Sequence, residues 1–275
     1  LGSFDDIDAA MLSHATSKQS DGDLAVGGTS LGHLVKYVEF FGLASHAAGA
    51  PQDGINALKA ANIAMMAMDS QRESFEDKDK VRVHGILTAG GTSVNSIPSI
   101  AKLEWRIRGR TIDVVNKINI KIDRSIKAGA MAMGAKVRIR SIAGNLPMLQ
   151  NKHMNNIYLN NAENIVGKNN VVLHPDDQSG GSTDMGDLSQ ILPIIHPRSG
   201  GAEGTGHGNN YFIKDYEKSV INPAKAMATT IIDLLWPDDM QINEVINNHK
   251  PNYSISEYIA LQNKRMGNDF NDYTS

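Results

Sequence analysis

Nine histidines and no cysteine determine which metal and nucleophile chemistry this chain of 275 residues can support. Without cysteine, a disulfide framework, a zinc finger and a thiol nucleophile are all excluded. No two histidines have a compact metal-binding spacing such as His-Glu-x-x-His, so a metal site has to be assembled from distant segments. A single histidine is more often structural than a ligand, and we keep that interpretation for four of them: His33, His153, His174 and His249.

Two glycine-rich loops carry groups that suit a metal or an anionic substrate. His207 lies in Gly-Thr-Gly-His-Gly-Asn-Asn-Tyr, on a loop of the kind that holds catalytic groups at strand ends in α/β folds. A catalytic role and a local hydrogen bond are equally compatible with this pattern. The loop at 179–189 presents Gly181, Ser182 and Thr183, whose N–H and hydroxyl groups can hold an anion. The alternative is an ordinary turn that caps a helix.

Three polar residues in the middle of the chain have types that suit acyl chemistry. His46 is surrounded by small residues, Asn95 lies between two expected strands, and Arg108 ends the next strand. An imidazole, an amide and a guanidinium fork suit an oxyanion and a substrate carboxylate. The simpler alternatives are loop hydrogen bonding for His46 and Asn95 and a surface charge for Arg108.

The composition restricts the function classes further. Apolar residues make up 41% and charged residues 21%, with a net charge of −3, so we expect a globular protein that does not bind nucleic acid. No apolar run reaches the roughly 18 residues of a membrane span, so no membrane association is expected. The lack of cysteine fits a cytoplasmic location, and no basic segment followed by an apolar one indicates a secretory signal.

The elements that would position these residues follow a recognisable order between 34 and 143. Period-two apolar patterns predict strands at 35–41, 81–87, 101–107 and 136–142, and helical spacing predicts helices at 56–74 and 112–133. The resulting β-α-β-β-α-β order predicts a ferredoxin-like unit, with two helices on one face of a four-stranded sheet.

The apolar patterns of the flanking segments are typical of a second α/β domain. Residues 17–29 are expected to form a loop, helices are expected at 152–165, 220–236 and 255–265, and short buried strands at 171–174 and 191–196. We therefore expect a ferredoxin-like domain at 34–145, inserted between a remnant of an α/β catalytic domain at 1–33 and its C-terminal part at 146–275. The chain starts with Leu and has little sequence before 34, so the host domain is expected to be N-terminally incomplete.

These motifs together resemble the dinuclear metallopeptidases of family M20. The resemblance is carried by the stretch from 41 to 57 around His46, by 84–98 with Arg108 behind it, and by Ser-Thr-Asp-Met-Gly-Asp-Leu-Ser with His207. The sequence is similar to the amidohydrolase branch, subfamily D, which includes aminobenzoyl-glutamate hydrolase subunits and β-alanyl-lysine dipeptidases. The resemblance extends to about residue 236.

The resemblance implies an amidohydrolase that uses two divalent metal ions, zinc or manganese, and pairs as a homodimer through its lid domain. It implies that His14 and His207 are metal ligands and that His46 stabilises the oxyanion in the partner's site. It further implies that Asn95 and Arg108 contact a small substrate with a free carboxylate, which the 181–184 loop also binds. His14 is followed by Ala15 where the family has proline, so this match is weaker.

The sequence lacks the family motifs that precede the His14 position: an earlier metal-binding motif, a bridging acidic residue and a Glu-Glu pair. We therefore expect the chain alone to bind few or no metal ions and to be inactive as an amidase. The alternative from a different class is a non-catalytic dimerisation or small-molecule-binding module.

Overall fold

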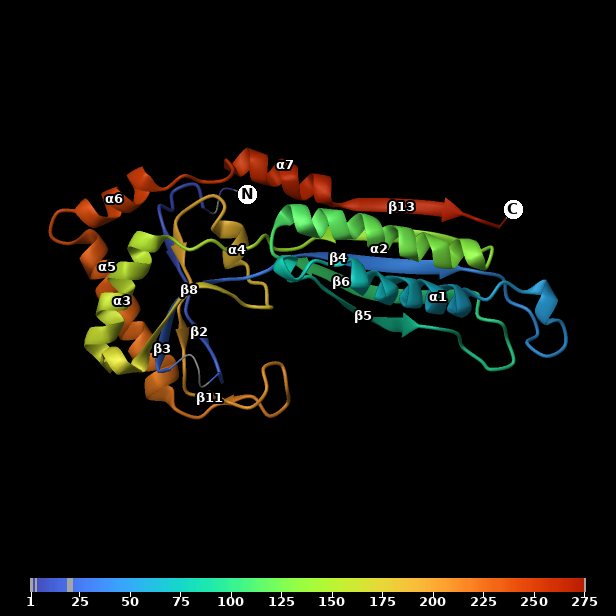
Figure 1. Ribbon diagram of the computed structural model, residues 1–275, viewed down its shortest axis with the longest axis horizontal. Helices are drawn as coiled ribbons and strands as arrows, with labels where there is room; N and C mark the ends of the chain where they lie inside the picture. The colour runs from blue at the N-terminus through green and yellow to red at the C-terminus, as the bar shows by residue number, and fades with distance from the viewer. Residues whose placement is uncertain (1, 3, 19–21, 275) are drawn as a thin grey trace. The chain divides into compact units, whose positions relative to one another are not determined.

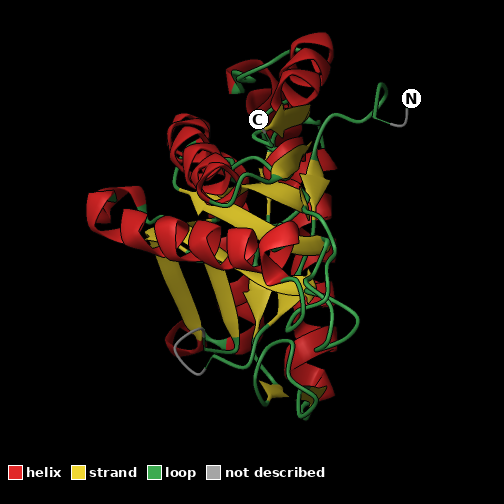
Figure 2. Cartoon of the chain, turned by 90° about the vertical axis from the view of Figure 1, so that its right-hand side faces the viewer, coloured by secondary structure: helices red, strands yellow, loops and turns green. Residues whose placement is uncertain are grey.

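The computed structural model describes residues 2, 4–18 and 22–274, with only the backbone described at 175–178. The chain forms two compact units, and each is made of separate stretches of sequence. Unit 1 comprises Leu1–Ser30 with Met148–Ile255, and unit 2 comprises Leu31–Pro147 with Ser256–Ser275. Both units combine helices with strands, which confirms the expected α/β class. Figure 2 shows the helices and strands of the chain by colour. Among the described residues, no helix has the length and apolar character that crossing a membrane requires.

Unit 2 is the ferredoxin-like domain that the sequence predicts, with one additional strand. Its sheet has the order β13-β7-β4-β6-β5, and helices α1 and α2 run along it (Figure 1). The strands are β4 (Gly32–Phe41), β5 (Arg82–Ala89), β6 (Ile100–Gly109), β7 (Lys136–Ala143) and β13 (Gly267–Asp272). The helices are α1 (Ala57–Ser70) and α2 (Ile112–Ala132).

Strand β4 is the central strand of this sheet. It pairs antiparallel with β6 from Gly32 to Phe41 and with β7 from Leu34 to Phe41. Its residues alternate between a face buried under the helices, where Leu34, Val38 and Phe40 lie, and a face without helices. The buried face joins the apolar residues of both helices in a single core.

The two helices begin and pack as their sequences direct. Asn56 and Thr111 cap α1 and α2 by accepting hydrogen bonds from the first-turn N–H groups. The buried residues of α1 include four alanines, and a Cβ at Gly129 of α2 would lie 2.4 Å from the carbonyl oxygen of Ala60. A glycine at 129 is therefore what allows the two helices to approach so closely.

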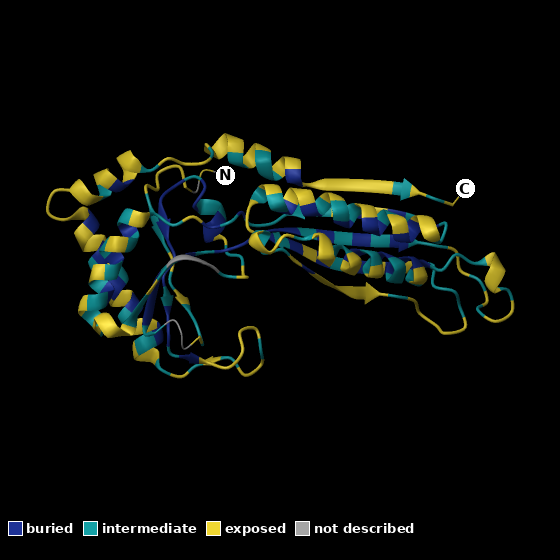
Figure 3. Cartoon of the chain, in the orientation of Figure 1, coloured by how far each residue is buried: buried dark blue, intermediate teal, exposed yellow. Residues whose placement is uncertain are grey.

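The last segment of the chain differs from the expected domain division. Residues 256–275, expected within the C-terminal catalytic part, pack with unit 2 instead. Helix α7 (Ile255–Arg265) is where it was expected, but β13 was not foreseen; it pairs antiparallel with β7 and is mostly exposed (Figure 3). Its sequence, Gly-Asn-Asp-Phe-Asn-Asp, is rich in residues that disfavour strands, so pairing with β7 decides its conformation.

Unit 1 contains a sheet of order β2-β10-β3-β8 and a two-stranded pair of β1 and β9. The strands are β1 (Ala10–Met11), β2 (His14–Ala15), β3 (Leu24–Thr29), β8 (Val171–Gln178), β9 (Ile194–Ile195) and β10 (Arg198–Ser199). Strand β11 (Ala202–Glu203) pairs with β12 (Phe212–Ile213). The prediction of a loop over 17–29 is wrong for β3, which lies between β10 and β8 in the sheet. The strand forms because Leu24, Ala25 and Val26 are buried in it.

The helices of unit 1 are α3 (Lys152–Val166), α4 (Met185–Leu188), α5 (Asn222–Leu235) and α6 (Met240–Asn248), and a π-helical turn at Glu217–Ile221 precedes α5. Side chains of α3, α5 and α6 form one core with Leu24, Val26 and Ile195. The helices expected at 152–165 and 220–236 correspond to α3 and α5, whereas α6 was not foreseen.

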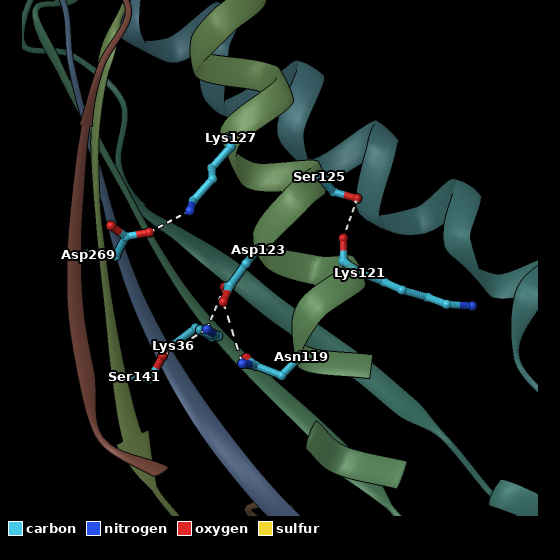
Figure 4. Close-up of polar contacts among 8 residues, drawn as sticks. All are labelled: Lys36, Asn119, Lys121, Asp123, Ser125, Lys127, Ser141 and Asp269. Carbon is cyan, nitrogen blue, oxygen red and sulfur yellow. Dashed lines mark hydrogen bonds and ion pairs between the residues drawn. The ribbon is translucent and has the colours of Figure 1, made fainter. Parts of the chain in front are cut away.

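One buried charge lies inside the core of unit 2 (Figure 4). The Lys36 side chain of β4 is fully buried and forms an ion pair with Asp123 of α2. Its ammonium also donates to the Ser141 hydroxyl of β7 at 2.8 Å, and Asn119 donates to Asp123. Burial lowers the pKa of Lys36, and the carboxylate of Asp123 opposes that shift. The pair joins β4, β7 and α2 at one point.

Replacing Asp123 by Asn should lower the free energy of unfolding by about 3 kcal/mol, because it leaves a buried ammonium without its counter-charge. The matched control is Asp269→Asn, which removes an ion pair to Lys127 whose side chains are 34% and 54% exposed. That change should cost less than about 1 kcal/mol. Urea unfolding measures both, and equal losses in the two variants would contradict the role assigned to Lys36.

Candidate active site

Unit 1 contains a cavity of about 790 Å³ that gathers residues from both of its sequence stretches. His14 and Lys18 come from the N-terminal stretch, and the 179–183 loop and the 206–208 loop come from the C-terminal one. The structure thus brings His14, His207 and the loop containing Gly181, Ser182 and Thr183 to one cavity. The walls are completed by residues such as Gly27, Gly28, Met148, His196, Arg198 and Tyr211.

The His14 ring is held in one orientation by the backbone carbonyl of the next residue, Ala15. It lies on β2, and its Nδ1 is 2.7 Å from the carbonyl oxygen of Ala15. Because a carbonyl only accepts, Nδ1 carries a proton, and in a neutral ring Nε2 then keeps its lone pair. The Tyr211 hydroxyl donates to the same carbonyl at 3.0 Å. A histidine fixed in this tautomer by a second hydrogen bond is arranged as metal-ligating histidines are.

His196 is a second imidazole beside His14 that the sequence analysis did not single out. Its side chain is almost fully buried, and the two ring centroids are 6.0 Å apart. Its Nδ1 lies 2.9 Å from the Leu12 carbonyl. Burial, together with the nearby His14, lowers the pKa of His196 to about 4, so the ring stays neutral at ordinary pH. His196 directly follows β9, and a position at the end of a strand is the sequence feature that could have identified it as a site residue.

His207 lies at the tip of the second loop with an unusual backbone conformation. Its φ is +65°, in the left-handed region, and its side chain is exposed to the cavity. Left-handed residues other than glycine cost conformational energy and gather at functional sites. Gly206 and Gly208 flank it, and the Gly208 N–H donates to the Thr205 carbonyl at 2.7 Å. The turn therefore directs the imidazole of His207 toward the cavity.

The 181–183 loop ends at the short helix α4. The Gly186 N–H donates to the carbonyl of Thr183, and the Met185 N–H donates to its hydroxyl. These hydrogen bonds form the helix-starting turn that was one of the two alternatives from the sequence. The other alternative, an anion-holding loop, stays a prediction. Ser182 and Thr183 are half-buried at the cavity wall.

In unit 2, His46 and Asn95 lie together in the loops beyond one end of the sheet. The Ala47 N–H donates to the Asn95 carbonyl at 2.9 Å, and the Ile97 N–H donates to the Ser45 carbonyl at 2.9 Å. The Nδ1 of His46 accepts from the N–H of Gly49 at 3.0 Å. In a neutral ring, this acceptor role places the proton on Nε2. His46 is thus an exposed imidazole with an N–H available for donation.

Arg108 lies at the opposite end of the same sheet. Its partner on β4 is His33, whereas Phe41, at the His46 end, pairs with Ile100. Eight residues of extended strand separate Arg108 from Ile100, which corresponds to about 27 Å. Burial, and then the charge of Arg106, lower the pKa of Arg108. The structure therefore separates Arg108 from His46 and Asn95, and one small substrate cannot contact all three in a single chain.

The donors at the cavity are of a kind that metals accept, but they are few. Imidazoles bind zinc and manganese, and His14 and His207 each have a side chain at the cavity. In the part of the chain that the structure describes, no group of three or more His, Cys, Asp or Glu side chains is arranged to hold a metal ion. Zinc sites use three or four protein ligands. The residues therefore fit part of a metal site and do not complete one.

Comparison with known proteins identifies a family match and several similar proteins. Residues 31–131 match the family model of the M20 peptidase dimerisation domain. The chain is 29% identical over 247 residues to a mouse Xaa-Arg dipeptidase, covering 86% of this chain and 54% of that protein. It is 35% identical over 141 residues to an indole-3-acetyl-aspartic acid hydrolase of Enterobacter agglomerans, covering 50% of this chain and 32% of that protein.

Among solved structures, an aminobenzoyl-glutamate utilization protein from Klebsiella pneumoniae has the same fold, with a TM-score of 0.64 and 20% identity. The match covers 86% of this chain and 57% of that one. Unit 2 therefore contains a stretch that matches the M20 peptidase dimerisation domain, and the chain is similar in sequence to the mouse Xaa-Arg dipeptidase over most of its own length. It spans about half the length of the mouse dipeptidase.

Because His196 is buried as the neutral ring, stability should depend on pH in a defined way. Its pKa is about 4 in the folded chain and 6.5 as the reference value, so the unfolded chain takes up the proton first as pH falls. The contribution of the neutral His196 ring to the free energy of unfolding is therefore complete above pH 6.5. It decreases toward pH 4, by about 3 kcal/mol in total. Urea unfolding of chelator-treated protein at several pH values measures this loss.

The control for this prediction is His196→Asn, which keeps a donor for the Leu12 carbonyl and does not titrate. The difference in stability between the wild type and this variant should shrink as pH falls from 6.5 to 4. A difference that is constant with pH would show that His196 is not buried as the neutral ring.

Proposed function

We propose that this chain supplies part of the active site of a metal-dependent amidohydrolase, which cleaves the amide bond of an N-acyl amino acid or dipeptide with a free carboxylate. The observation that carries the proposal is the meeting of His14, His207 and the 181–183 loop at one cavity. The names of the relatives, a dipeptidase and an acyl-aspartate hydrolase, support the reaction class.

In this proposal, His14 and His207 are two ligands of a centre with two divalent ions, zinc or manganese. When bound, such ions activate a water molecule and polarise the scissile carbonyl. The N–H and hydroxyl groups of Ser182 and Thr183 hold the substrate beside them. The remaining ligands and the general base are proposed to come from outside the described residues.

A zinc titration followed by calorimetry tests the two ligands. The full chain should bind zinc weakly, in the micromolar range or above, because two imidazoles form an incomplete site. His14→Ala and His207→Ala should each abolish this binding, while His153→Ala, a matched change to a histidine outside the cavity, should leave it intact. Equal binding by all of these variants would refute the assignment of His14 and His207.

The full chain should also have no measurable amidase activity toward N-acyl amino acids, even with added manganese or zinc. The reason is the incomplete ligand set. Robust turnover that chelator abolishes would contradict this expectation and would require a complete site within the chain. Strong binding of a carboxylate without turnover in any assembly would instead favour a non-catalytic binding module.

The opposite positions of Arg108 and His46 on the unit 2 sheet support different roles for them. We propose that His46 donates its Nε2–H to the developing oxyanion, with Asn95 beside it, in the site of a partner subunit. Arg108 binds the substrate carboxylate through its fork of N–H donors. The separation of about 27 Å is the reason for assigning the two groups to different active sites.

In an active assembly that contains this chain, His46→Ala should lower kcat by roughly 10²–10³-fold, the usual loss for one oxyanion donor. Its effect on KM should be small, because the bond strengthens only in the transition state. Arg108→Ala should raise KM sharply, and Arg108→Lys should restore only part, since an ammonium lacks the fork. Steady-state kinetics would contradict these roles if His46→Ala changed KM alone.

We further propose that the chain forms a homodimer through the β5 edge of unit 2. Strands β5 and β13 are the two edges of this sheet, and among the described strands β5 pairs only with β6 and β13 only with β7. Ile86 and Leu87 on β5 are exposed apolar residues. An uncovered strand edge can pair with the same edge of a second copy.

Sedimentation at tens of micromolar should show a dimer for the wild type and a monomer for the double variant Ile86→Lys and Leu87→Lys. Two charges on each edge repel one another and oppose strand pairing. The control is Asn268→Lys on β13, which should stay dimeric. A wild-type monomer, or dissociation in the β13 variant instead, would show that β5 is not the contact.

A further inference from the structure

Helix α7 ends in an arginine that is buried inside unit 2, and the proposed function gives this helix no role. Arg265 is the last residue of α7, and only 8% of it is exposed. One nitrogen of its guanidinium donates to the carbonyl oxygen of His33 at 2.6 Å, and another donates to that of Gly144 at 2.9 Å. The second nitrogen also donates to the side chain of Gln262 in the same helix. Because a guanidinium carries its donors in a rigid fork, these contacts fix its position.

The two carbonyl groups lie at the ends of neighbouring strands. The ladder between β4 and β7 ends with the pair Leu34 and Ala143. His33 and Gly144 are the next residues beyond that pair. The His33 N–H donates to the carbonyl of Asn145 at 2.9 Å, and the His33 carbonyl accepts from the guanidinium. The guanidinium therefore continues the connection between the two strands past their last residue pair.

The ring of His33 is held by its close approach to Gly144. A Cβ at position 144 would lie 2.3 Å from the Nε2 of His33, so only glycine leaves room for the ring in this position. The whole of His33 is buried. Its backbone is thus fixed by Arg265, and its ring is fixed against the backbone of Gly144.

His33 is also the residue directly opposite Arg108 in the sheet, one position from the end of the ladder between β4 and β6. Facing residues of an antiparallel pair project to the same side of the sheet, with Cβ atoms about 4.5–5.5 Å apart. The Arg108 side chain is half-buried. The immobile His33 is therefore the neighbour against which the stem of Arg108 lies.

We propose that Arg265 is a positioning residue for Arg108 and acts through His33. This inference rests on the proposed function, in which Arg108 binds the substrate carboxylate. A bidentate contact to a carboxylate is directional, so the fork of Arg108 has to be held in one orientation. Arg265 holds the end of the strand that carries His33, and His33 limits where Arg108 can turn. Helix α7 thus takes part in substrate binding without touching the substrate.

The Nε–H signal of Arg108, observed by NMR in the full chain, tests the positioning without turnover. Arg265→Gln removes the fork and should shift this signal. Gly144→Ala displaces the His33 ring by a different route and should shift it too. The matched control is Asp269→Asn, which removes the ion pair of β13 to α2 and should leave the signal in place. A signal unmoved by the first two changes, or moved equally by the control, would overturn the proposal.

In an active assembly that contains this chain, Arg265→Gln should raise KM roughly tenfold and change kcat little, because a misplaced fork weakens ground and transition states alike. Arg265→Lys should restore only part of the loss, since an ammonium cannot hold both carbonyl groups in the fork geometry. A role in stability alone would instead lower the fraction of folded enzyme, and with it kcat, at an unchanged KM. That result would overturn the proposal.

The outcomes separate this inference from the proposed function. If Arg108→Ala leaves KM unchanged while Arg265→Gln shifts the Arg108 signal, the positioning stands and the carboxylate role of Arg108 fails. If Arg108→Ala raises KM while Arg265→Gln changes neither KM nor the signal, the carboxylate role stands and the positioning fails. If Arg265→Gln does not fold, Gly144→Ala decides through the same two measurements.

Discussion

The pairing of β4 on both of its edges is the constraint on which unit 2 depends. Ten consecutive residues of β4 pair with β6, and eight of them also pair with β7. A shift of one residue would turn every core side chain of β4 toward the helix-free face, so the register is strongly fixed. The buried Lys36 adds to this restriction, because only one register places it opposite Asp123. The same register fixes Arg108 at one end of the sheet and the His46 loop at the other.

Much of unit 2 could be predicted from the sequence, because its pattern is periodic and local. The strands and helices between 34 and 143 follow alternation and helical spacing, and Asn56 and Thr111 mark helix starts. Strand β13 could not be predicted, because its residues have low strand propensity and only pairing with β7 orders it. The register that places Arg108 opposite His33 is likewise a property of tertiary pairing, and the order of residues does not show it.

The cavity in unit 1 was predictable only in part. His207 and the 181–183 loop were found from their glycines, and the meeting of His14 with them follows the family resemblance. His196 was not found, because a histidine after a short apolar run has the same pattern as a core residue. Its burial beside His14 and its low pKa emerge only from the fold. A polar residue whose pKa is set by burial in the fold cannot be recognised from the sequence pattern around it.

The two units thus divide the proposed chemistry between them. In that proposal, unit 1 supplies His14, His207 and the 181–183 loop, and unit 2 supplies His46, Asn95 and Arg108. His46 and Arg108 are at opposite ends of one sheet, so the proposed roles of both residues place them in the active sites of two subunits. This makes dimerisation a chemical requirement of the proposed mechanism and gives the β5 edge a role in activity.

The most direct test of this account is complementation in mixed dimers of an active assembly that contains the chain. One parent carries His46→Ala and keeps its metal ligands, and the other carries His207→Ala and keeps its lid. The mixed dimer should regain activity well above either parent, since one of its sites has both an intact metal centre and an intact His46. Mixed dimers that form but stay as inactive as their parents would contradict it.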